Sequence, residues 1–362
     1  MIYGIVLYRY STDKEGKPVR KAKIYTKEEH KISKESIDPD AYRIVEHLRG
    51  CGYDAYIVGG AVRDLVVGKK PKDFDIVTSA TPSRIKRLFK NSRIIGKRFR
   101  LVHVFFGEKI FEVSTFRSIV DGSVGNDFGT MDEDVQRRDF SINALYYDPI
   151  KEQVIDYVDG IEDIQKKVLK PVIPIDRIFE EDPVRMLRAV KYSSMIGCRM
   201  PHSLRSKIKK SAHLLMSVSP SRLTEELLKI MNSGHSFEIV SAALEFDVFM
   251  YLQPSGCAMM YADKKFERSY MMHLKEMDEF VRANPNSRLG KKLSYMIFDF
   301  INSLTDWKRE IDSSAAGELY TKTWTQCRNF VLPMNPQRTE LEYAIKTSLL
   351  KLGVNVRIAK KK

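Results

Sequence analysis

The sequence predicts an α+β protein, in which a small mixed α/β head precedes a mostly helical body. Up to about residue 175, short apolar runs of strand length alternate with helical patterns and glycine turns. Beyond that point, apolar residues recur at three- and four-residue spacing between Gly, Pro and Ser. A chain of 362 residues also exceeds the usual size of one domain, so we expect more than one packed core.

These patterns divide the chain into four expected segments. Residues 1–37 are rich in Lys and Glu with little periodicity, so we expect a basic arm or irregular lead-in. Residues 38–175 form the head, 176–253 a helical neck, and 254–362 a helical body with the basic tail VRIAKKK.

The elements of the head can be justified in order. From Asp38, AYRIVEHLRGCG has the spacing of an amphipathic helix closed by Gly50 and Gly52. AYIV then predicts a buried strand that runs into Gly59 and Gly60, and AVRDLVVG predicts a helix. The elements expected next are a strand in DFDIVTSA, a helix in RIKRLFK after Thr81-Pro82-Ser83, strands in LVHVFFG and KIFEVSTF, a helix entering a short strand in FSINALYYD, and VIDYVDG with a helix beyond it. Helices in EEDPVRMLRAVKYSSMIG and SPSRLTEELLKIMNSG open the helical part.

The composition favours a polyanionic partner. The chain has 61 Lys and Arg against 47 Asp and Glu, a formal charge of +14, and a pI near 9.4. Nucleic acid is the first candidate, and a basic composition without a specific partner is the alternative. The four cysteines have no C-x-x-C spacing, which indicates neither a zinc site nor a disulfide framework. With no long apolar stretch and no basic n-region, we expect a cytoplasmic protein with no membrane partner.

An Asp-Phe-Asp sequence is the first candidate for chemistry. If it lies in a strand, Asp73 and Asp75 point the same way and Phe74 points into the core. Two carboxylates so close repel unless a cation lies between them, and hard oxygen ligands suit Mg²⁺ bridged to phosphates. An acidic strand end without function would have the same sequence.

Glycine and arginine residues on either side add to this site. Gly59 and Gly60 allow backbone amides to approach phosphate oxygens, and Arg63 adds positive charge one helical turn later. A plain strand-to-helix turn is the alternative. Arg138 follows another arginine and precedes Asp139, a combination suited to gripping a triphosphate, or else an ordinary helix-start ion pair.

A third carboxylate is needed if two metal ions hold both the attacking and the leaving oxygen of a phosphoryl displacement. Glu112 is the first candidate, on a strand expected beside the Asp-Phe-Asp strand, and Asp139 is the second. A solvent-facing glutamate at a sheet edge is the alternative for Glu112.

A charged stripe marks the first helix of the neck. Its members recur every three residues, and are Asp182, Arg185, Arg188 and Lys191. A carboxylate accepts from an amino group and a guanidinium donates to a ring nitrogen, so Asp182 and Arg185 could read the edge of a nucleobase. A solvated charge stripe is the alternative.

Together, VGGAVRD, KDFD, RRDFSINAL and EEDPVRMLRA resemble the class II polymerase β-like nucleotidyltransferases, which include CCA-adding enzymes and bacterial poly(A) polymerases. The resemblance is specific from about Lys27 to about Pro254. It implies that Gly60 and Arg63 bind the phosphates of the incoming nucleotide and that Asp73 and Asp75 hold magnesium. The residues expected around the nucleotide are Arg138, Asp182, Arg185 and Arg188. Lys191 stands where an arginine is often found, which keeps the charge and removes a bidentate contact.

Two stretches outside the pocket, KEEHKISKESID and GKRFRLVHVFFG, are similar to the bacterial poly(A) polymerase pattern. We therefore expect addition of AMP from ATP to the 3′ ends of mRNA or other transcripts, and CCA addition to tRNA is the alternative. A non-catalytic RNA-binding protein is a second alternative, although it would be expected to lose the repulsive pair Asp73 and Asp75. Arg98 and Arg100, separated by one residue, are predicted to contact single-stranded RNA.

Overall fold

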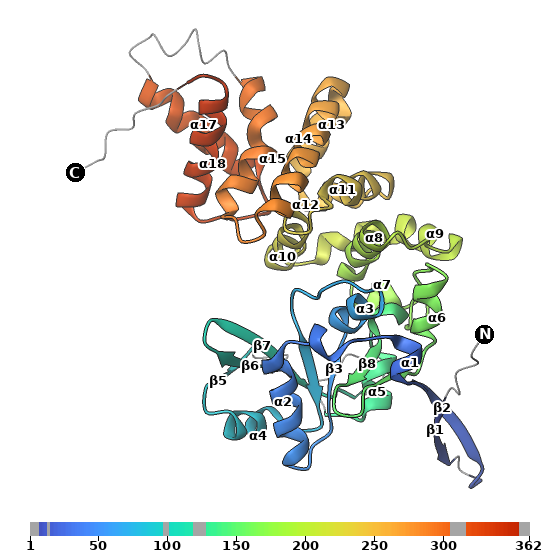
Figure 1. Cartoon of the computed structure of the whole chain (residues 1–362). Coiled ribbons are helices and arrows are strands. Elements are labelled where there is room, and N and C mark those ends of the chain that lie inside the picture. Colours follow the sequence, from blue (N-terminus) through green and yellow to red (C-terminus); the bar gives the residue numbers. More distant parts are fainter. Residues whose placement is uncertain (1–6, 13–14, 97–100, 119–127, 305–315, 355–362) are drawn as a thin grey trace. The chain divides into compact units, whose positions relative to one another are not determined.

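A computed structural model describes residues 7–12, 15–96, 101–118, 128–304 and 316–354 (Figure 1). The chain divides into two compact units. The first comprises Met1–Glu181 with Arg199–Pro201, and the second comprises Asp182–Cys198 with His202–Lys362. A mixed sheet in the first unit and helices in the second confirm the predicted α+β class. The finer division into four segments stays a prediction.

The first unit is built on a nine-stranded sheet with the order β1-β2-β9-β8-β3-β4-β7-β6-β5. Only β4 and β7 pair in parallel among the strands described, and the other neighbours are antiparallel. The strands are β1 (Leu7–Thr12), β2 (Pro18–Tyr25), β3 (Ala55–Val58), β4 (Asp75–Thr78), β5 (Ser92–Ile95), β6 (Leu101–Phe106), β7 (Lys109–Thr115), β8 (Leu145–Asp148) and β9 (Gln153–Asp156).

Short helices connect these strands. They are α1 (Lys27–His30), α2 (Pro39–Gly50), α3 (Gly60–Val66), α4 (Pro82–Leu88), α5 (Met131–Gln136), α6 (Gly160–Gln165) and α7 (Ile178–Glu181), with 3-10 turns η1 (Lys34–Ser36) and η2 (Ser141–Asn143). The start of α2 follows from its sequence, because Asp38 accepts a hydrogen bond from the backbone N–H of Asp40 at 2.9 Å and Pro39 opens the helix.

One face of the sheet carries the candidate site. Because side chains alternate along a strand, Tyr56 and Val58 of β3 share a face with their β4 partners Val77 and Asp75. A buried cluster covers this face with α5, and its members are Ala22, Tyr56, Val58, Val77, Phe116, Met131, Val135, Tyr146 and Ile155. The α2 helix packs against β3 and β4, and α4 packs against β5, β6 and β7.

The second unit is helical, as predicted. Its helices are α8 (Val184–Ile196), α9 (His202–Ser211), α10 (Pro220–Met231), α11 (Ser236–Glu245), α12 (Phe249–Leu252), α13 (Pro254–Ala262), α14 (Lys264–Ala283), α15 (Leu289–Leu304), α17 (Ala316–Phe330) and α18 (Arg338–Lys351), with the 3-10 turn η3 (Ala212–Ser217). The α8 helix packs on α10 and α11, whereas α15 packs on α14, α17 and α18.

Three local predictions are wrong. The basic arm is largely regular, because β2 pairs with β9 through Lys23, Ile24 and Tyr25, a contact with a distant segment that local periodicity does not reveal. The strand β5 was not expected. The helix expected at FSIN is a single 3-10 turn. There the Ser141 hydroxyl donates a hydrogen bond of 2.6 Å to Oδ2 of Asp163 in α6.

Candidate functional site

The Gly59-Gly60 turn joins β3 to α3 at the end of the buried strand. Gly59 has a φ of +70°, which residues with a side chain rarely adopt. A Cβ on Gly59 would lie 3.8 Å from Nη1 of Arg138, so the turn passes directly beside that guanidinium. The structure thus brings together two of the predicted phosphate-binding elements.

Arg63 lies one turn into α3 and is 7% exposed. Its Nη1 donates to Oδ1 of Asn143 at 2.7 Å, and its Nη2 and Nε donate to Oδ1 of Asp64 at 2.8 and 3.0 Å. The guanidinium folds back toward the turn, with Nη2 3.6 Å from where a Cβ on Gly60 would lie. Arg63 therefore fastens the glycine turn to η2, and its contact with a phosphate stays a prediction.

The strand that was expected to carry both aspartates contains only Asp75. Asp75 is the first residue of β4 and pairs with Val58, beside the glycine turn. Asp73 precedes the strand, so strand alternation does not fix its direction, and this part of our argument is wrong. Both residues are exposed, which leaves their carboxylates accessible to an ion or a nucleotide.

Glu112 lies next to Asp75 in the sheet. The parallel register pairs Ile76 of β4 with Val113 of β7, which places Asp75 and Glu112 side by side one position earlier. Side chains at paired positions share a face, so both carboxylates lie on the α5 side of the sheet. His103 pairs with Glu112 across β6 and β7, and its Nε2 lies 3.5 Å from Oε1 of Glu112.

Arg138 belongs to a half-buried arginine cluster around the buried Asp134. Its Nη2 and Nε donate to Oδ2 of Asp134 at 2.9 and 3.3 Å, and Nε also donates to the Tyr146 hydroxyl at 2.9 Å. The backbone N–H of Arg117 donates to Oδ1 of Asp134 at 3.3 Å, and Nε of Arg137 lies 3.6 Å from the same oxygen.

Three arginines, Arg117, Arg137 and Arg138, gather around the single carboxylate of Asp134. Burial and the nearby Arg117 together lower the pKa of Arg137 to about 10. Burial alone would lower the pKa of Arg138, but Tyr146 and Asp134 outweigh it and raise that pKa. Burial would raise the pKa of Asp134, but Arg138 and Arg137 keep it below its usual value. Several guanidinium groups gathered at one place favour an anion beside them.

Asp139 follows this cluster and is half-buried. Its Oδ1 accepts a hydrogen bond from the backbone N–H of Phe140 at 2.8 Å, which orients the start of the η2 segment. A role for Asp139 as the third carboxylate stays a prediction.

The remaining nucleotide-binding candidates lie in the second unit. Asp182 precedes α8 and accepts two hydrogen bonds from Nη2 of Arg222 on α10, at 2.9 and 2.8 Å. Nζ of Lys191 donates to Oε2 of Glu226 at 2.9 Å, and Nε of Arg188 lies 3.7 Å from Oε1 of the same residue. Arg185 is 5% and Lys191 7% exposed, so the alternative of a solvated stripe is wrong for these two residues.

Glu226 is 2% exposed and holds several cations at once. Burial would raise its pKa, but Lys191, Lys229 and Arg188 outweigh burial and lower it to about 2. Burial lowers the pKa of Lys191, and the attraction of Glu226 opposes this effect. Glu226 therefore stays ionised and fixes the positions of two candidate nucleotide-binding residues.

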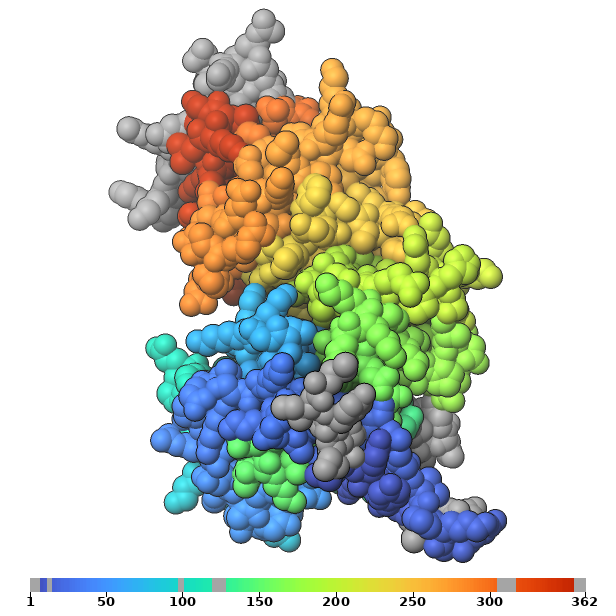
Figure 2. All heavy atoms as spheres, turned by 45° about the vertical axis from the view of Figure 1, so that its right-hand side comes forward, coloured from blue at the N-terminus to red at the C-terminus, as the bar shows by residue number. Residues whose placement is uncertain are grey.

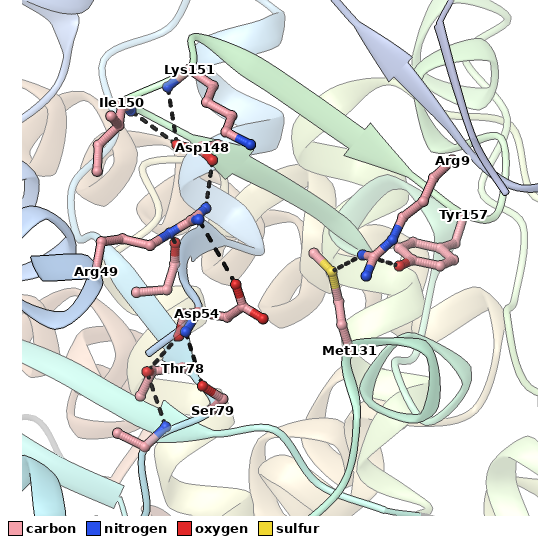
Figure 3. Close-up of polar contacts among 12 residues, drawn as sticks. Arg9, Arg49, Asp54, Thr78, Ser79, Met131, Asp148, Ile150, Lys151 and Tyr157 are labelled. Carbon is pink, nitrogen blue, oxygen red and sulfur yellow. Dashed lines mark hydrogen bonds and ion pairs between the residues drawn. The ribbon is translucent and has the colours of Figure 1, made fainter. Parts of the chain in front are cut away.

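The opposite end of β3 is fastened by a separate polar network (Figure 3). Arg49 of α2 forms an ion pair with Asp148 of β8 and donates from Nε to the carbonyl of Ala55 at 3.3 Å. The Thr78 hydroxyl donates to the carbonyl of Asp54 at 2.6 Å. These bonds join α2, β3, β4 and β8, and so stabilise the strands that carry the glycine turn and Asp75.

Two predictions about ligands can be placed against the structure. Arg98 and Arg100 lie outside the described residues. In the part of the chain that the structure describes, no three His, Cys, Asp or Glu residues are clustered so as to hold a metal ion. Asp73 and Asp75 nevertheless supply accessible hard oxygen donors, and Glu112 adds another beside Asp75, so these residues fit a divalent ion that takes its other ligands from phosphates.

The predictions about cysteines and membrane spans can also be compared with the structure. All four cysteines are free, and three of them are buried. None of the helices described is both long and apolar enough to cross a bilayer.

Comparison with known proteins decides the family. Residues 55–170 match the family described as poly A polymerase head domain, and residues 199–260 match the probable RNA and SrmB-binding site of polymerase A. The chain belongs to the class II nucleotidyltransferases. The predicted resemblance is therefore confirmed, and the first match covers the glycine turn, both aspartates and the arginine cluster.

Individual relatives include two kinds of enzyme. The chain is 40% identical over 277 residues to "Poly(A) polymerase I" of Salmonella typhi, covering 72% of this chain and 60% of the relative. It is 34% identical over 234 residues to the "CCA-adding enzyme" of Lactobacillus helveticus, covering 62% of this chain and 56% of the relative. The chain thus spans about three fifths of the length of these curated relatives.

Solved structures share the fold of this nucleotidyltransferase. The Bacillus stearothermophilus CCA-adding enzyme in complex with CTP has a TM-score of 0.59 and 24% identity, covering 88% of this chain and 85% of that one. The Thermotoga maritima CCA-adding enzyme complexed with tRNA has a TM-score of 0.55 and 21% identity, covering 93% and 88%. At these identities the likeness shows the fold alone.

Sequence reasoning missed the residues that support the site. Asp134 and Tyr146 accept hydrogen bonds from Arg138, and Asn143 accepts one from Arg63. Asp134 could have been found from its spacing, since it lies four residues before Arg138 at the end of α5, a separation at which ion pairs form on helices. Asn143 and Tyr146 could not, because a 3-10 turn and a sheet crossing bring them to the arginines. Arg222 and Glu226 of α10 were missed for the same reason, since helix packing brings them to α8.

Proposed function

We propose that this chain transfers AMP from ATP to the 3′ end of RNA. In this reaction the RNA 3′-oxygen forms a bond to the α-phosphorus of ATP, the bond from that phosphorus to the β-phosphate bridging oxygen breaks, and pyrophosphate leaves. The proton of the 3′-hydroxyl is released. The observation that carries the proposal is the position of Asp75 at the end of β4, beside the Gly59-Gly60 turn and on the same sheet face as the arginine cluster.

This arrangement assigns a role to each part of the head. The Gly59-Gly60 turn and Arg138 would hold the triphosphate, with positive charge from Arg117 and Arg137 behind them. Asp73 and Asp75 would hold Mg²⁺, with Glu112 as a third carboxylate. The ion neutralises charge on the phosphates and on the leaving pyrophosphate. The positive charge around Asp134 would stabilise the same negative charge on the phosphates and the leaving pyrophosphate.

Base selection would take place in the second unit. Asp182 and Arg185 would pair with the edge of the adenine ring, and Arg188 and Lys191 would surround the nucleotide. GTP and UTP present a ring N–H where Arg185 donates, so we expect both to be rejected. The choice of ATP over CTP rests on the 40% identity to a poly(A) polymerase and on the two poly(A)-like stretches outside the pocket.

CCA addition to tRNA is the second candidate, favoured by the 34% identity to a CCA-adding enzyme. One experiment separates the two. The protein is incubated with oligo(A), and separately with tRNA lacking its 3′ end, with ATP alone, CTP alone or both. We expect ATP alone to extend oligo(A). Ordered addition of C, C and A to the tRNA would instead favour CCA addition, and no incorporation in any arm would favour a non-catalytic RNA-binding protein.

A further inference from the structure

The N-terminal hairpin of β1 and β2 lies at one edge of the sheet, and no part of the proposed reaction uses it. The two strands follow β9 at the end of the strand order, Figure 1 shows them projecting outward, and Figure 2 shows them at the surface of the first unit. β1 lies four inter-strand spacings from β3, the strand that leads into the glycine turn. At about 4.8 Å a step, the hairpin lies roughly 19 Å across the sheet from that turn.

One face of the hairpin is bound to the rest of the unit. Ala22 of β2 is 3% exposed within the buried cluster under α5. Its β1 partner, Arg9, donates from Nη1 to the Tyr157 hydroxyl at 2.8 Å and to Sδ of Met131 at 3.3 Å. Figure 3 shows Arg9 pointing toward these two residues. This face fixes the hairpin to the head.

The other face carries aromatic rings and a guanidinium. Tyr8 and Tyr10 lie two positions apart on β1 with their ring centroids 6.3 Å apart, and are 38% and 60% exposed. Arg20, the β2 partner of Tyr10, lies with its guanidinium carbon 3.9 Å from the centroid of the Tyr8 ring. We call Tyr8, Tyr10 and Arg20 the hairpin platform.

Charge around the platform favours a polyanion. The described residues of the hairpin include five cations and one carboxylate, namely Arg9, Lys17, Arg20, Lys21, Lys23 and Glu15. Lys17, Lys21 and Lys23 form ion pairs with Glu15, Asp132 and Asp159, so the contact with a polyanion depends on Arg20. Arg20 stacks on a ring and is exposed, so its guanidinium can reach a phosphate. Exposed rings beside an exposed cation are the combination that binds single-stranded nucleic acid, because bases stack on the rings and phosphates meet the charge.

We infer that the hairpin platform binds single-stranded RNA upstream of the 3′ end that enters the site. This contact is separate from residues 199–260, which match the family's probable RNA-binding segment. The inference takes RNA as the partner from the proposed function, but it does not depend on catalysis or on the choice of ATP. Binding by stacking predicts little sequence preference and a dependence on RNA length.

The test measures RNA binding by the full chain without nucleotide or metal. Fluorescent single-stranded RNA of about 16 nucleotides, long enough to cover a stacking groove, is titrated with the parent protein, Tyr8→Ala, Tyr10→Ala and Arg20→Ala. Each tyrosine variant should raise the Kd at least about fivefold, the effect of losing one base stack. Arg20→Ala should also reduce the slope of log K against log salt by about 0.7, the value for one phosphate contact on a single strand.

Matched variants keep the result specific. Tyr10→Phe retains the ring and should bind like the parent. Ile110→Ala removes an exposed apolar side chain from β7, and Arg93→Ala removes an exposed cation from β5 at the opposite sheet edge. Both controls should leave the Kd unchanged. Thermal unfolding verifies that each variant is folded, as expected for exposed positions.

Two results would overturn the inference. Unchanged RNA affinity in Tyr8→Ala and Tyr10→Ala, with ATP incorporation intact, would show that the platform does not bind RNA. The proposed function would be unaffected by that result. A change of mass in sedimentation for these variants, with unchanged RNA affinity, would assign the platform to a second copy of this chain. Platform-dependent RNA binding without any nucleotide incorporation would support the inference while removing the proposed function.

Discussion

Asp75 and Glu112 stand at equivalent positions of neighbouring parallel strands, yet their surroundings differ. Asp75 begins β4 beside the Gly59-Gly60 turn, whereas Glu112 lies within β7 with His103 3.5 Å away. Asp75 is therefore the carboxylate on which the proposed chemistry depends most directly.

Asp75→Asn should lower the rate of AMP incorporation by roughly two to three orders of magnitude, because the amide cannot neutralise charge as a carboxylate does. Its exposed position implies an unchanged thermal unfolding temperature. Single-turnover incorporation with radiolabelled ATP measures the effect, with exposed Glu108→Gln as the control. Near-parental incorporation would refute the metal assignment. Glu112→Gln with parental activity would transfer the third-carboxylate role to Asp139 or to substrate.

Glu226 is a positioning residue whose charge can be tested by pH. Its folded pKa of about 2 lies below the usual value of 4.5, so its contribution to stability is present above about pH 4.5 and is lost as the pH falls toward 2. Glu226→Gln should therefore be less stable than the parent at neutral pH, and the difference should shrink through this window. Urea unfolding at several pH values measures it, and a difference that stays constant with pH would contradict the ionised pair.

At the scale of elements, side chains of α10 hold the candidate nucleotide-binding side chains on and just before α8 in position. Arg222 and Glu226 lie one turn apart on α10, so one helix face holds Asp182 through the first residue and Arg188 with Lys191 through the second. Because a rigidly placed donor or acceptor rejects a base that does not match it, the α8–α10 contact is expected to set base selectivity.

Arg222→Ala frees the Asp182 carboxylate and should reduce the preference for ATP over CTP by about tenfold, the value of one well-placed charged hydrogen bond. The ratio of kcat/KM for the two nucleotides on oligo(A) measures this preference. Arg205→Ala is the matched control, since Arg205 forms an exposed ion pair of 2.7 Å with Glu245 in the same unit. An unchanged ratio in Arg222→Ala, or an equal fall in the control, would show that the Arg222–Asp182 contact does not set the nucleotide preference.

Elements with strong local signals were predicted from the sequence. The α2 helix starts where Asp38 and Pro39 indicate, and β3 ends at the glycine turn. The hairpin of β1 and β2 could not be predicted, because its strands are stabilised by pairing with β9 and by Arg9 reaching Tyr157. The predicted site residues carry recognisable motifs, whereas Asn143, Arg222 and Glu226 contact such residues only through packing of distant segments.

At the scale of the whole molecule, positive charge recurs in structurally distinct places. It accumulates around Asp134 in the head, on the hairpin platform, and along α8. Glu226 neutralises only part of the charge on α8, and the formal charge of the chain is +14. Association with RNA should therefore be driven by phosphate contacts that do not distinguish one sequence from another.

RNA affinity of the full chain should consequently fall steeply with salt and vary little among oligo(A), oligo(U) and oligo(C). Each phosphate neutralised contributes about −0.7 to the slope of log K against log salt, because bound counterions are released from a single strand. Fluorescence anisotropy at several potassium chloride concentrations measures the slope, and a non-ionic osmolyte at matched osmolarity is the control. A flat response to salt would mean that the charge surplus does not contact RNA. A strong preference for oligo(A) without nucleotide would mean that the chain reads RNA bases directly, and selectivity would then not be confined to the incoming nucleotide.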